Sequence, residues 1–362
     1  MSTLKVDNIR HNNATSDAIT MASDGTCTAR ITGMTGGSGL SHRNILINPE
    51  FKIWQRGTSW SSGVNRYVMD RWYQWGYNAI PSQITGTNGS QYGVRLKHND
   101  STSNSFSAWS STLEKKDIFH TIGKHLVLSF WMRKGSAFTG GMSCQIVART
   151  DSESKINSGT NVTIGNQDIA GSLTTDWQKF TIKTTQVVPT TEVVGVNFWH
   201  HTTSGTDANN YFDLNQVQLE VGDTATSFEH RNTSEELSRC QRYFYRIGGQ
   251  SRTYQVVGNG FVGQNGGTKC AKIIVNFPTT MRDRPTLSVI GTDAFKGDTG
   301  GAASAMDCTA TANTGGMWND ASSTDIAWVD FGRTGGGSPA NGTAVVVYTT
   351  GAQGEVAFSA EL

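Results

Sequence analysis

The chain has 362 residues, which is enough for two or three domains. It contains 41 Gly but 6 Pro, and only 16% of its residues are charged, so the composition favours an all-β fold with many turns. A formal net charge of +1 excludes a global field that would attract nucleic acid or an anionic membrane. No apolar run approaches the ~20 residues that span a bilayer, so we expect no membrane insertion.

The five cysteines are far apart and show no CxxC or Cys/His spacing that would indicate zinc or a redox pair. The opening "MSTLKVDNIR" is polar and lacks the apolar stretch of a secretory signal. We therefore expect free, buried thiols in a protein that is made in a reducing cytoplasm. The cysteines are Cys27, Cys144, Cys240, Cys270 and Cys308.

Residues 1–40 form the first predicted segment. The apolar positions Leu4, Val6 and Ile9 suggest short β-segments, but they are too few to build a core alone. Such a segment becomes ordered against a partner, or else it is a disordered tail. The Gly-rich end of the segment, "GMTGGSG", is typical of a flexible linker.

Residues 41–232 show short apolar and polar alternation between turn signals, which predicts a β-sandwich. The clearest strand is "GKHLVLSFWMRKG", in which Leu126, Leu128, Phe130 and Met132 share one face at a period of two residues. Two other segments alternate in the same way, namely "WQKFTIKT" and "VVGVNFWHH".

Residues 233–247 contain the one convincing helix. Thr233 is the predicted N-cap, and Glu236 three residues later would complete a capping box. Leu237, Cys240 and Phe244 then fall on one apolar face of this connecting helix.

Residues 248–362 return to strand patterns and predict a second, smaller β-sandwich. In "KCAKIIVNF", one face would carry Ala271, Ile273, Val275 and Phe277, and the other Cys270, Lys272, Ile274 and Asn276. The stretch from Gly297 to Ser323 is rich in Gly, Ala, Ser and Thr, and we interpret it as a long exposed loop.

The densest motif of the chain is "QLEVGDTATSFEHRNTSEELSRCQRYFYR", Gln218 to Arg246. Further motifs are the opening "STLKVDNI", the pair "NILINPEFKIWQRGTS" and "MDRW", and the later "FPTTMRDRPTLSV" and "VAFSAEL". Together these motifs resemble bacteriophage tail-fibre and related virion proteins of the marine and cyanobacterial phage type.

The resemblance implies a jelly roll like that of carbohydrate-binding modules over residues 41–232, followed by a C-terminal β-domain. It implies a homotrimer on the virion, at the tail or neck, assembled in the host cytoplasm. The N-terminal segment, through Leu4, Val6 and Ile9, would dock to other virion proteins. The partner outside the particle would be a host-surface glycan.

Aromatic residues are the candidate glycan contacts, because flat rings stack on the apolar face of a sugar. Trp75 and Tyr77 come first, and Trp131 and Trp177 follow because each opposes the apolar face of its strand. Trp318 in the predicted distal loop is a further candidate. Any of these rings could instead belong to the core or to a subunit interface.

Other polar residues near the sandwich suggest structural roles. Trp72 in "DRW" is expected in the core, and its neighbours Asp70 and Arg71 could form a buried pair. By analogy with related sandwiches, Glu50 and Asp213 are candidate ligands of a structural calcium ion. No other cofactor is implied.

His200 and His201 are adjacent on a predicted strand, so they point to opposite faces and cannot chelate one metal. We expect both to be exposed or to face a turn.

The chain shows no nucleophile elbow, no phosphate loop and no β-helix repeat. Carboxylates could still pair in space, for example Asp168, Asp176, Glu192 and Asp213. We expect a non-enzymatic adhesin that binds host glycans. The alternatives are a purely structural spacer or adaptor of the virion and, less favoured, a glycan depolymerase.

Overall fold

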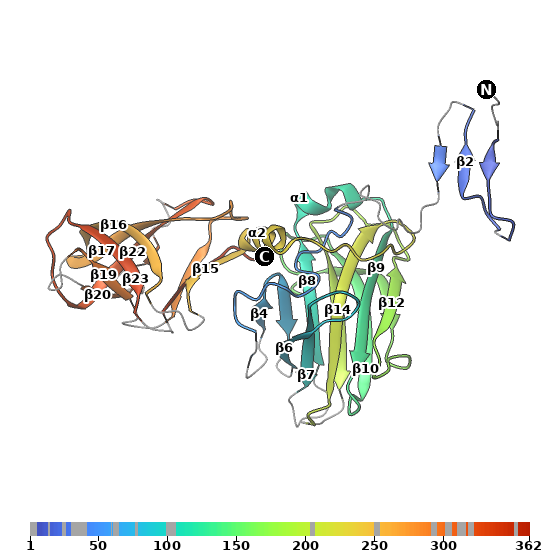
Figure 1. Ribbon diagram of the computed structural model, residues 1–362, viewed down its shortest axis with the longest axis horizontal. Helices are drawn as coiled ribbons and strands as arrows, with labels where there is room; N and C mark the ends of the chain where they lie inside the picture. The colour runs from blue at the N-terminus through green and yellow to red at the C-terminus, as the bar shows by residue number, and fades with distance from the viewer. Residues whose placement is uncertain are drawn as a thin grey trace.

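The computed structural model shows a nearly all-β chain with two main units joined at a short helix (Figure 1). The predicted fold class is confirmed: a jelly-roll sandwich is followed by a second, smaller β-unit. The structure describes residues 6–13, 15–23, 27–29, 42–58, 60, 65–76, 79–98, 106–202, 207–249, 254–290, 295–300, 306–309, 316–317, 322–350 and 354–362.

The N-terminal strands form a three-stranded sheet of their own (Figure 1). Ile9 and Met21 are exposed on it, Val6 is exposed just before β1, and Leu4 lies outside the described residues. Exposed apolar side chains on so small a sheet agree with a segment that needs a partner. The strands are β1 (Asn8–Ile9), β2 (Ile19–Met21) and β3 (Cys27–Ala29).

Two antiparallel sheets face each other in the sandwich. The six-stranded sheet consists, in order across it, of β11 (Asn161–Asp168), β10 (Gly140–Arg149), β13 (Val193–Thr202), β8 (Phe106–Leu113), β5 (Trp72–Trp75) and β4 (Arg66–Met69). The five-stranded sheet consists of β12 (Gln178–Lys183), β9 (Leu126–Lys134), β14 (Tyr211–Val221), β7 (Tyr92–His98) and β6 (Ala79–Thr85).

The core between these sheets follows the predicted alternation. All four predicted apolar side chains of β9 are buried in it, and so is Trp72. Trp72 packs between Phe51 and Trp109, with ring centroids at 5.1 and 6.3 Å. A short helix, α1 (Lys115–Ile118), and a 3-10 turn (Phe119–Thr121) follow β8 at one end of the sandwich.

The connecting helix, α2 (Thr233–Gln241), is shorter than predicted and is capped one residue earlier. The side chain of Asn232 accepts a hydrogen bond from the backbone N–H of Ser234 at 2.9 Å, so Asn232 rather than Thr233 is the N-cap. Glu236 does not close a capping box. Its carboxylate instead accepts a hydrogen bond from the backbone N–H of Asn48 at 2.6 Å and pairs with Arg231, so it satisfies two buried donors.

Phe244 is not helical. It begins β15 (Phe244–Gly248), which pairs with β24 (Glu355–Ser359), because the aromatic run "YFY" suits a strand with a partner. Leu237 and Cys240 do share an apolar face, and they pack with Ile47 and Tyr243 against the sandwich.

The C-terminal unit combines two sheets around one core. The three-stranded sheet has the order β15, β24 and β18 (Thr286–Ile290). In the seven-stranded sheet, a further pairing of β17 with β22 closes the strands into a ring. Its strands are, in order, β17 (Thr268–Asn276), β16 (Val256–Asn265), β23 (Ala344–Thr349), β19 (Phe295–Asp298), β20 (Met306–Thr309), β22 (Ile326–Gly336) and β21 (Gly316–Met317).

The stretch from Gly297 to Ser323 is not only loop, because it contains β20, β21 and the end of β19. Met306 and Cys308 alternate around Asp307 and are fully buried, so this short strand does belong to the core. The Gly-rich surroundings hid that alternation in the sequence.

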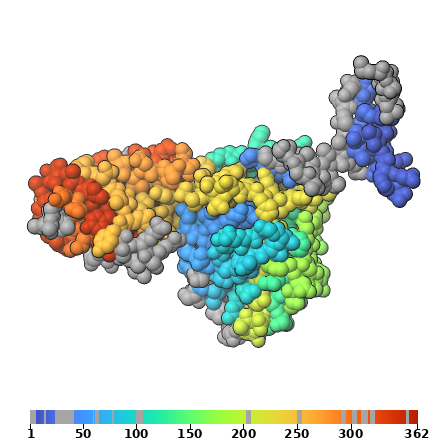
Figure 2. All heavy atoms as spheres, in the orientation of Figure 1, coloured from blue at the N-terminus to red at the C-terminus, as the bar shows by residue number. Residues whose placement is uncertain are grey.

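The two units are in contact along a seam that α2 and its flanking residues cover (Figure 2). The C-terminus returns to this seam beside α2 (Figure 1). There Arg71 and Arg56 of the sandwich pair with Glu361 at the chain end. Glu114 of the sandwich accepts from Arg242 at 3.1 Å and from the Tyr243 hydroxyl.

Candidate functional site

The outer face of the six-stranded sheet gathers aromatic and amide side chains. On β13 the side chains that point into the core alternate with Asn197 and Trp199, which therefore face outward. On β5, Trp72 is buried, so Tyr73 and Trp75 lie on the same outer face. On β8 the outward side chains are Phe106, which is exposed, and the small residues Ala108, Ser110 and Thr112, which are buried between their larger neighbours.

One row across this face is built from a phenol, a hydroxyl and amides. Tyr73 of β5 lies opposite Ser110 of β8, and Ser110 lies opposite Asn197 of β13. Asn197 lies opposite Gln145 of β10, which lies opposite Asn166 of β11. The register thus aligns five polar groups across five strands.

The polar groups of this row are partly bonded to each other. The amide N–H of Asn197 donates to Oε1 of Gln145 at 3.1 Å, and the Ser143 hydroxyl donates to Asn166 at 2.6 Å. Oδ1 of Asn197 is buried and has no partner among the described residues. A buried amide oxygen without a partner is costly, so an internal water molecule is expected beside it, because Asn197 is fully buried.

The neighbouring row places two tryptophans on either side of an alanine. Trp75 lies opposite Ala108, and Ala108 lies opposite Trp199 on the next strand. The two tryptophans are therefore two strand spacings apart, roughly 10 Å. Phe106 stacks on Trp199 with centroids 4.7 Å apart and planes 4° apart. The indole N–H of Trp75 donates to the Ser110 hydroxyl at 3.1 Å, which fixes that ring over the polar row.

The loop between β10 and β11 covers one end of the face. Ile156 is fully buried against Val147 and Val193, and it closes that end of the sheet. The ammonium group of Lys155 lies 5.0 Å from the centroid of the Tyr73 ring. The same ammonium group lies 5.8 Å from the centroid of the Trp75 ring, so the loop borders both rings and leaves Trp75 half-buried.

This arrangement suits the recognition of a neutral polyhydroxylated ligand. Aromatic faces supply apolar surface for C–H groups, while amides and hydroxyls both donate to and accept from ligand hydroxyls. The Tyr73 phenol is a hydrogen-bond donor at neutral pH, as any tyrosine is, and burial raises its pKa further.

The predicted aromatic candidates do not form one site. Trp75 lies on the face described above, whereas Trp131 and Trp177 lie on the outer face of the five-stranded sheet. Tyr77 and Trp318 lie outside the described residues. The sequence analysis did not single out Trp199 or Asn197, although their alternation with buried neighbours on β13 could have identified both.

The expected calcium ligands bind protein cations instead. Glu50 pairs with Lys52, and it accepts from the Ser90 hydroxyl at 2.6 Å. Asp213 is held between Arg95 and Arg133. Within the described residues, no three His, Cys, Asp or Glu side chains gather in a way that could hold a metal ion. Neither carboxylate is therefore arranged as a calcium ligand.

Other polar residues also differ from expectation. Asp70 and Arg71 are both buried but do not pair with each other, since Asp70 accepts from Gln55 and Arg71 pairs with Glu361. The four described cysteines are free and buried, as predicted. No helix in the described part of the chain is long and apolar enough to cross a membrane.

His200 was expected to be exposed but is buried in an aromatic cluster. Its ring stacks on Phe138 with centroids 4.7 Å apart and meets the edge of Phe212 at 5.5 Å. The adjacent His201 is exposed. The two histidines do point to opposite faces, but the inward face at this point is the core of the sandwich.

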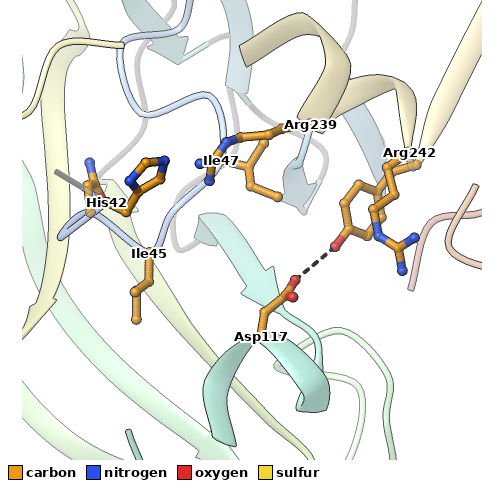
Figure 3. Close-up of a pocket in the computed structure, with 8 residues that line it drawn as sticks. His42, Ile45, Ile47, Asp117, Arg239 and Arg242 are labelled. Carbon is orange, nitrogen blue, oxygen red and sulfur yellow. Dashed lines mark hydrogen bonds between the residues drawn. The ribbon is translucent and has the colours of Figure 1, made fainter. Parts of the chain in front are cut away.

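A hollow of about 290 Å³ lies at the junction of the sandwich with α2 (Figure 3). The hydroxyl of Tyr243 donates to Asp117 at 3.5 Å inside it (Figure 3). The charged groups around it already have partners, with Arg239 paired to Glu235 and Arg242 to Glu114. The hollow therefore belongs to the joint between the units and is a weaker candidate than the aromatic face.

No protein-family model matches the sequence, and no curated protein matches it. Solved structures that are similar include the enzymatically active domain of bacteriophage CBA120 tailspike protein 4. It is 10% identical at a TM-score of 0.33, over 50% of this chain and only 22% of that one.

Two carbohydrate-binding structures are similarly distant. One is TmCBM61 in complex with β-1,4-galactotriose, which is 13% identical at a TM-score of 0.30, over 50% of this chain and 99% of that one. The other belongs to a study of promiscuous modules of the β-sandwich superfamily. It is 10% identical at a TM-score of 0.33, over 56% of this chain and 71% of that one. Values this low leave the function to be argued from the site itself.

Proposed function

We propose that this protein is a virion fibre or appendage subunit that attaches a bacteriophage to host-surface glycans without catalysis. The observation that carries the proposal is the outer face of the six-stranded sheet. There Trp75 and Trp199 lie on either side of Ala108, next to a row of polar groups that includes Gln145 and Asn166. Neutral sugars offer this face both the apolar surface and the hydroxyls that it can bind.

The virion role rests on the sequence motifs and on the N-terminal segment. Val6 and Ile9 are exposed on a sheet too small to be stable alone, as a docking element requires. A fibre presents several copies of each weak glycan site, and linked sites gain avidity without any new contact.

Removal of either tryptophan is expected to weaken glycan binding. The substitutions Trp75→Ala and Trp199→Ala should each cost about 1–3 kcal/mol of binding free energy, as expected for an aromatic anchor. The measurement is a glycan array followed by titration of the best neutral oligosaccharide, with a melting curve for each variant.

The matched control is Tyr254→Ala, which removes an aromatic ring that is 71% exposed on the C-terminal unit. It should bind as the parent does. If both tryptophan variants melt like the parent and keep its affinity, the ligand is bound elsewhere and this site assignment is wrong.

We also expect a homotrimer, because a fibre with a weak N-terminal core needs partner chains. Light scattering on the purified full-length protein should give three times 39.1 kDa. A monodisperse monomer at micromolar concentration would contradict the fibre model.

A purely structural spacer is the second candidate function. The ion pairs at the seam favour it, since Glu361 binds Arg56 of the sandwich and Glu114 binds Arg242 beside α2, as a spacer that transmits force requires. Under this reading the full-length protein binds neither glycans nor host cells, although it still assembles into particles.

A further inference from the structure

The outer face of the five-stranded sheet holds a second polar cluster, opposite the neutral face. Asp213 of β14 lies between Arg133 of β9 and Arg95 of β7 in one register row. Arg95 donates to both carboxylate oxygens at 2.7 and 2.9 Å, and Nε of Arg133 donates to one of them at 2.8 Å. Asp213 is fully buried, so it positions both guanidinium groups.

Each arginine is also held by an aromatic ring. The Arg95 guanidinium lies 3.6 Å from the centroid of Tyr211, and that of Arg133 lies 4.9 Å from the centroid of Trp177. Their side chains are still 30% and 31% exposed. Within the described residues, Arg133 uses only Nε in hydrogen bonds, which leaves its terminal N–H groups for a ligand.

The rows beside this cluster add positive charge. Lys97 lies opposite Tyr211, and Lys179 lies opposite Trp131. The row of Asp213 and the two rows beside it thus carry four cationic groups, the two arginines and two lysines, against the one carboxylate of Asp213. Lys183 and Glu220 lie farther along the same face. The rows around Asp213 therefore carry a local excess of positive charge next to two tryptophans, in a chain whose net charge is only +1.

We propose that this arginine face is a second binding site and that it takes the carboxylate of an acidic saccharide. A planar guanidinium, fixed in place before binding, matches a carboxylate with two parallel hydrogen bonds. Trp177 and Trp131 then offer ring faces to the sugar that carries it. The sandwich thus binds neutral sugar on one sheet and acidic sugar on the other.

The test titrates the full-length protein with oligogalacturonate, with its methyl ester and with the neutral galactose oligomer of the same length. The free acid should bind at least tenfold more tightly than the ester, and added NaCl should weaken it. Arg133→Gln should lower the affinity at least tenfold. The matched control is Lys183→Gln, which removes an exposed lysine on β12 that pairs with Asp223 outside the cluster.

Arg133→Gln removes one hydrogen-bond partner of the buried Asp213 and could therefore destabilise the fold. A melting curve of this variant is recorded to detect such a loss. The double variant Lys97→Gln/Lys179→Gln changes no partner of Asp213 and should also lower the affinity for the acid, by about threefold or more. Equal binding of acid and ester, or unchanged binding by both variants, would overturn the proposal. Preference for a sulfated over a carboxylated oligomer would overturn the carboxylate assignment. Binding of the neutral oligomer reports the six-stranded face, so failure of one site is distinguishable from failure of the other.

Discussion

Glu361→Ala is expected to lower the free energy of unfolding by about 3–5 kcal/mol, because it leaves a buried charge without its partner. The Glu361 carboxylate accepts from Arg71 and, at 3.1 Å, from Arg56. Arg71 is only 1% exposed. Burial alone would lower the pKa of Arg71, but the charge and hydrogen bond of Glu361, together with Tyr243 and Tyr67, raise that pKa above its usual value.

Denaturant unfolding followed by tryptophan fluorescence measures this change. The matched control is Glu235→Ala, which breaks an exposed pair with Arg239 one helical turn away. That control should cost about 0.5 kcal/mol or less. A cost below about 1 kcal/mol for Glu361→Ala would mean that the C-terminal residues do not hold the two units together.

Acidification should destabilise the sandwich through His200. Burial, and next the charges of His98 and His201, lower the pKa of His200 from 6.5 to about 3. Between these values the unfolded chain binds a proton that the folded chain does not. The contribution of His200 is therefore complete above pH 6.5 and is lost as the pH falls toward 3, by about 1.4 kcal/mol per pH unit.

His200→Phe should flatten this part of the stability curve, because it removes the titrating group and keeps a ring against Phe138. Nε2 of His200 has no partner in the described part of the chain, so the substitution removes no hydrogen bond there. The measurement compares unfolding free energies of parent and variant at pH 7, 5 and 4. His201→Gln, on the exposed neighbour, should keep the slope of the parent, and equal slopes for all three proteins would contradict the assignment.

The two proposed faces divide one sandwich between two kinds of ligand. Trp75 and Trp199 lie near uncharged amides with a single ammonium group, that of Lys155, at the edge, whereas Trp177 lies beside Arg133 in the arginine cluster. Aromatic rings alone do not distinguish these surfaces. The groups between them do, because charge selects acidic ligands and uncharged amides do not.

Much of the fold could be predicted from local pattern alone. The alternation of Leu126, Leu128, Phe130 and Met132 identified the buried side of β9, because successive side chains of a strand point to opposite faces. The same rule separated the inner Trp72 from the outer Trp75. The prediction of the helix was wrong at both ends. Asn232 rather than Thr233 caps it, and Phe244 forms a strand because it pairs with Ser359, far away in the sequence.

The candidate sites were decided by the tertiary structure. Sequence placed Trp75, Trp131 and Trp177 on outer faces, but strand order put them on different sheets. Cross-strand register then determined their neighbours. Asn197 and Trp199 lie near Trp75, and Arg133 lies beside Trp177. Alternation is a property of one strand and can be read locally. Pairing joins residues a hundred positions apart through backbone hydrogen bonds that any side chain permits, so only the folded chain reveals it.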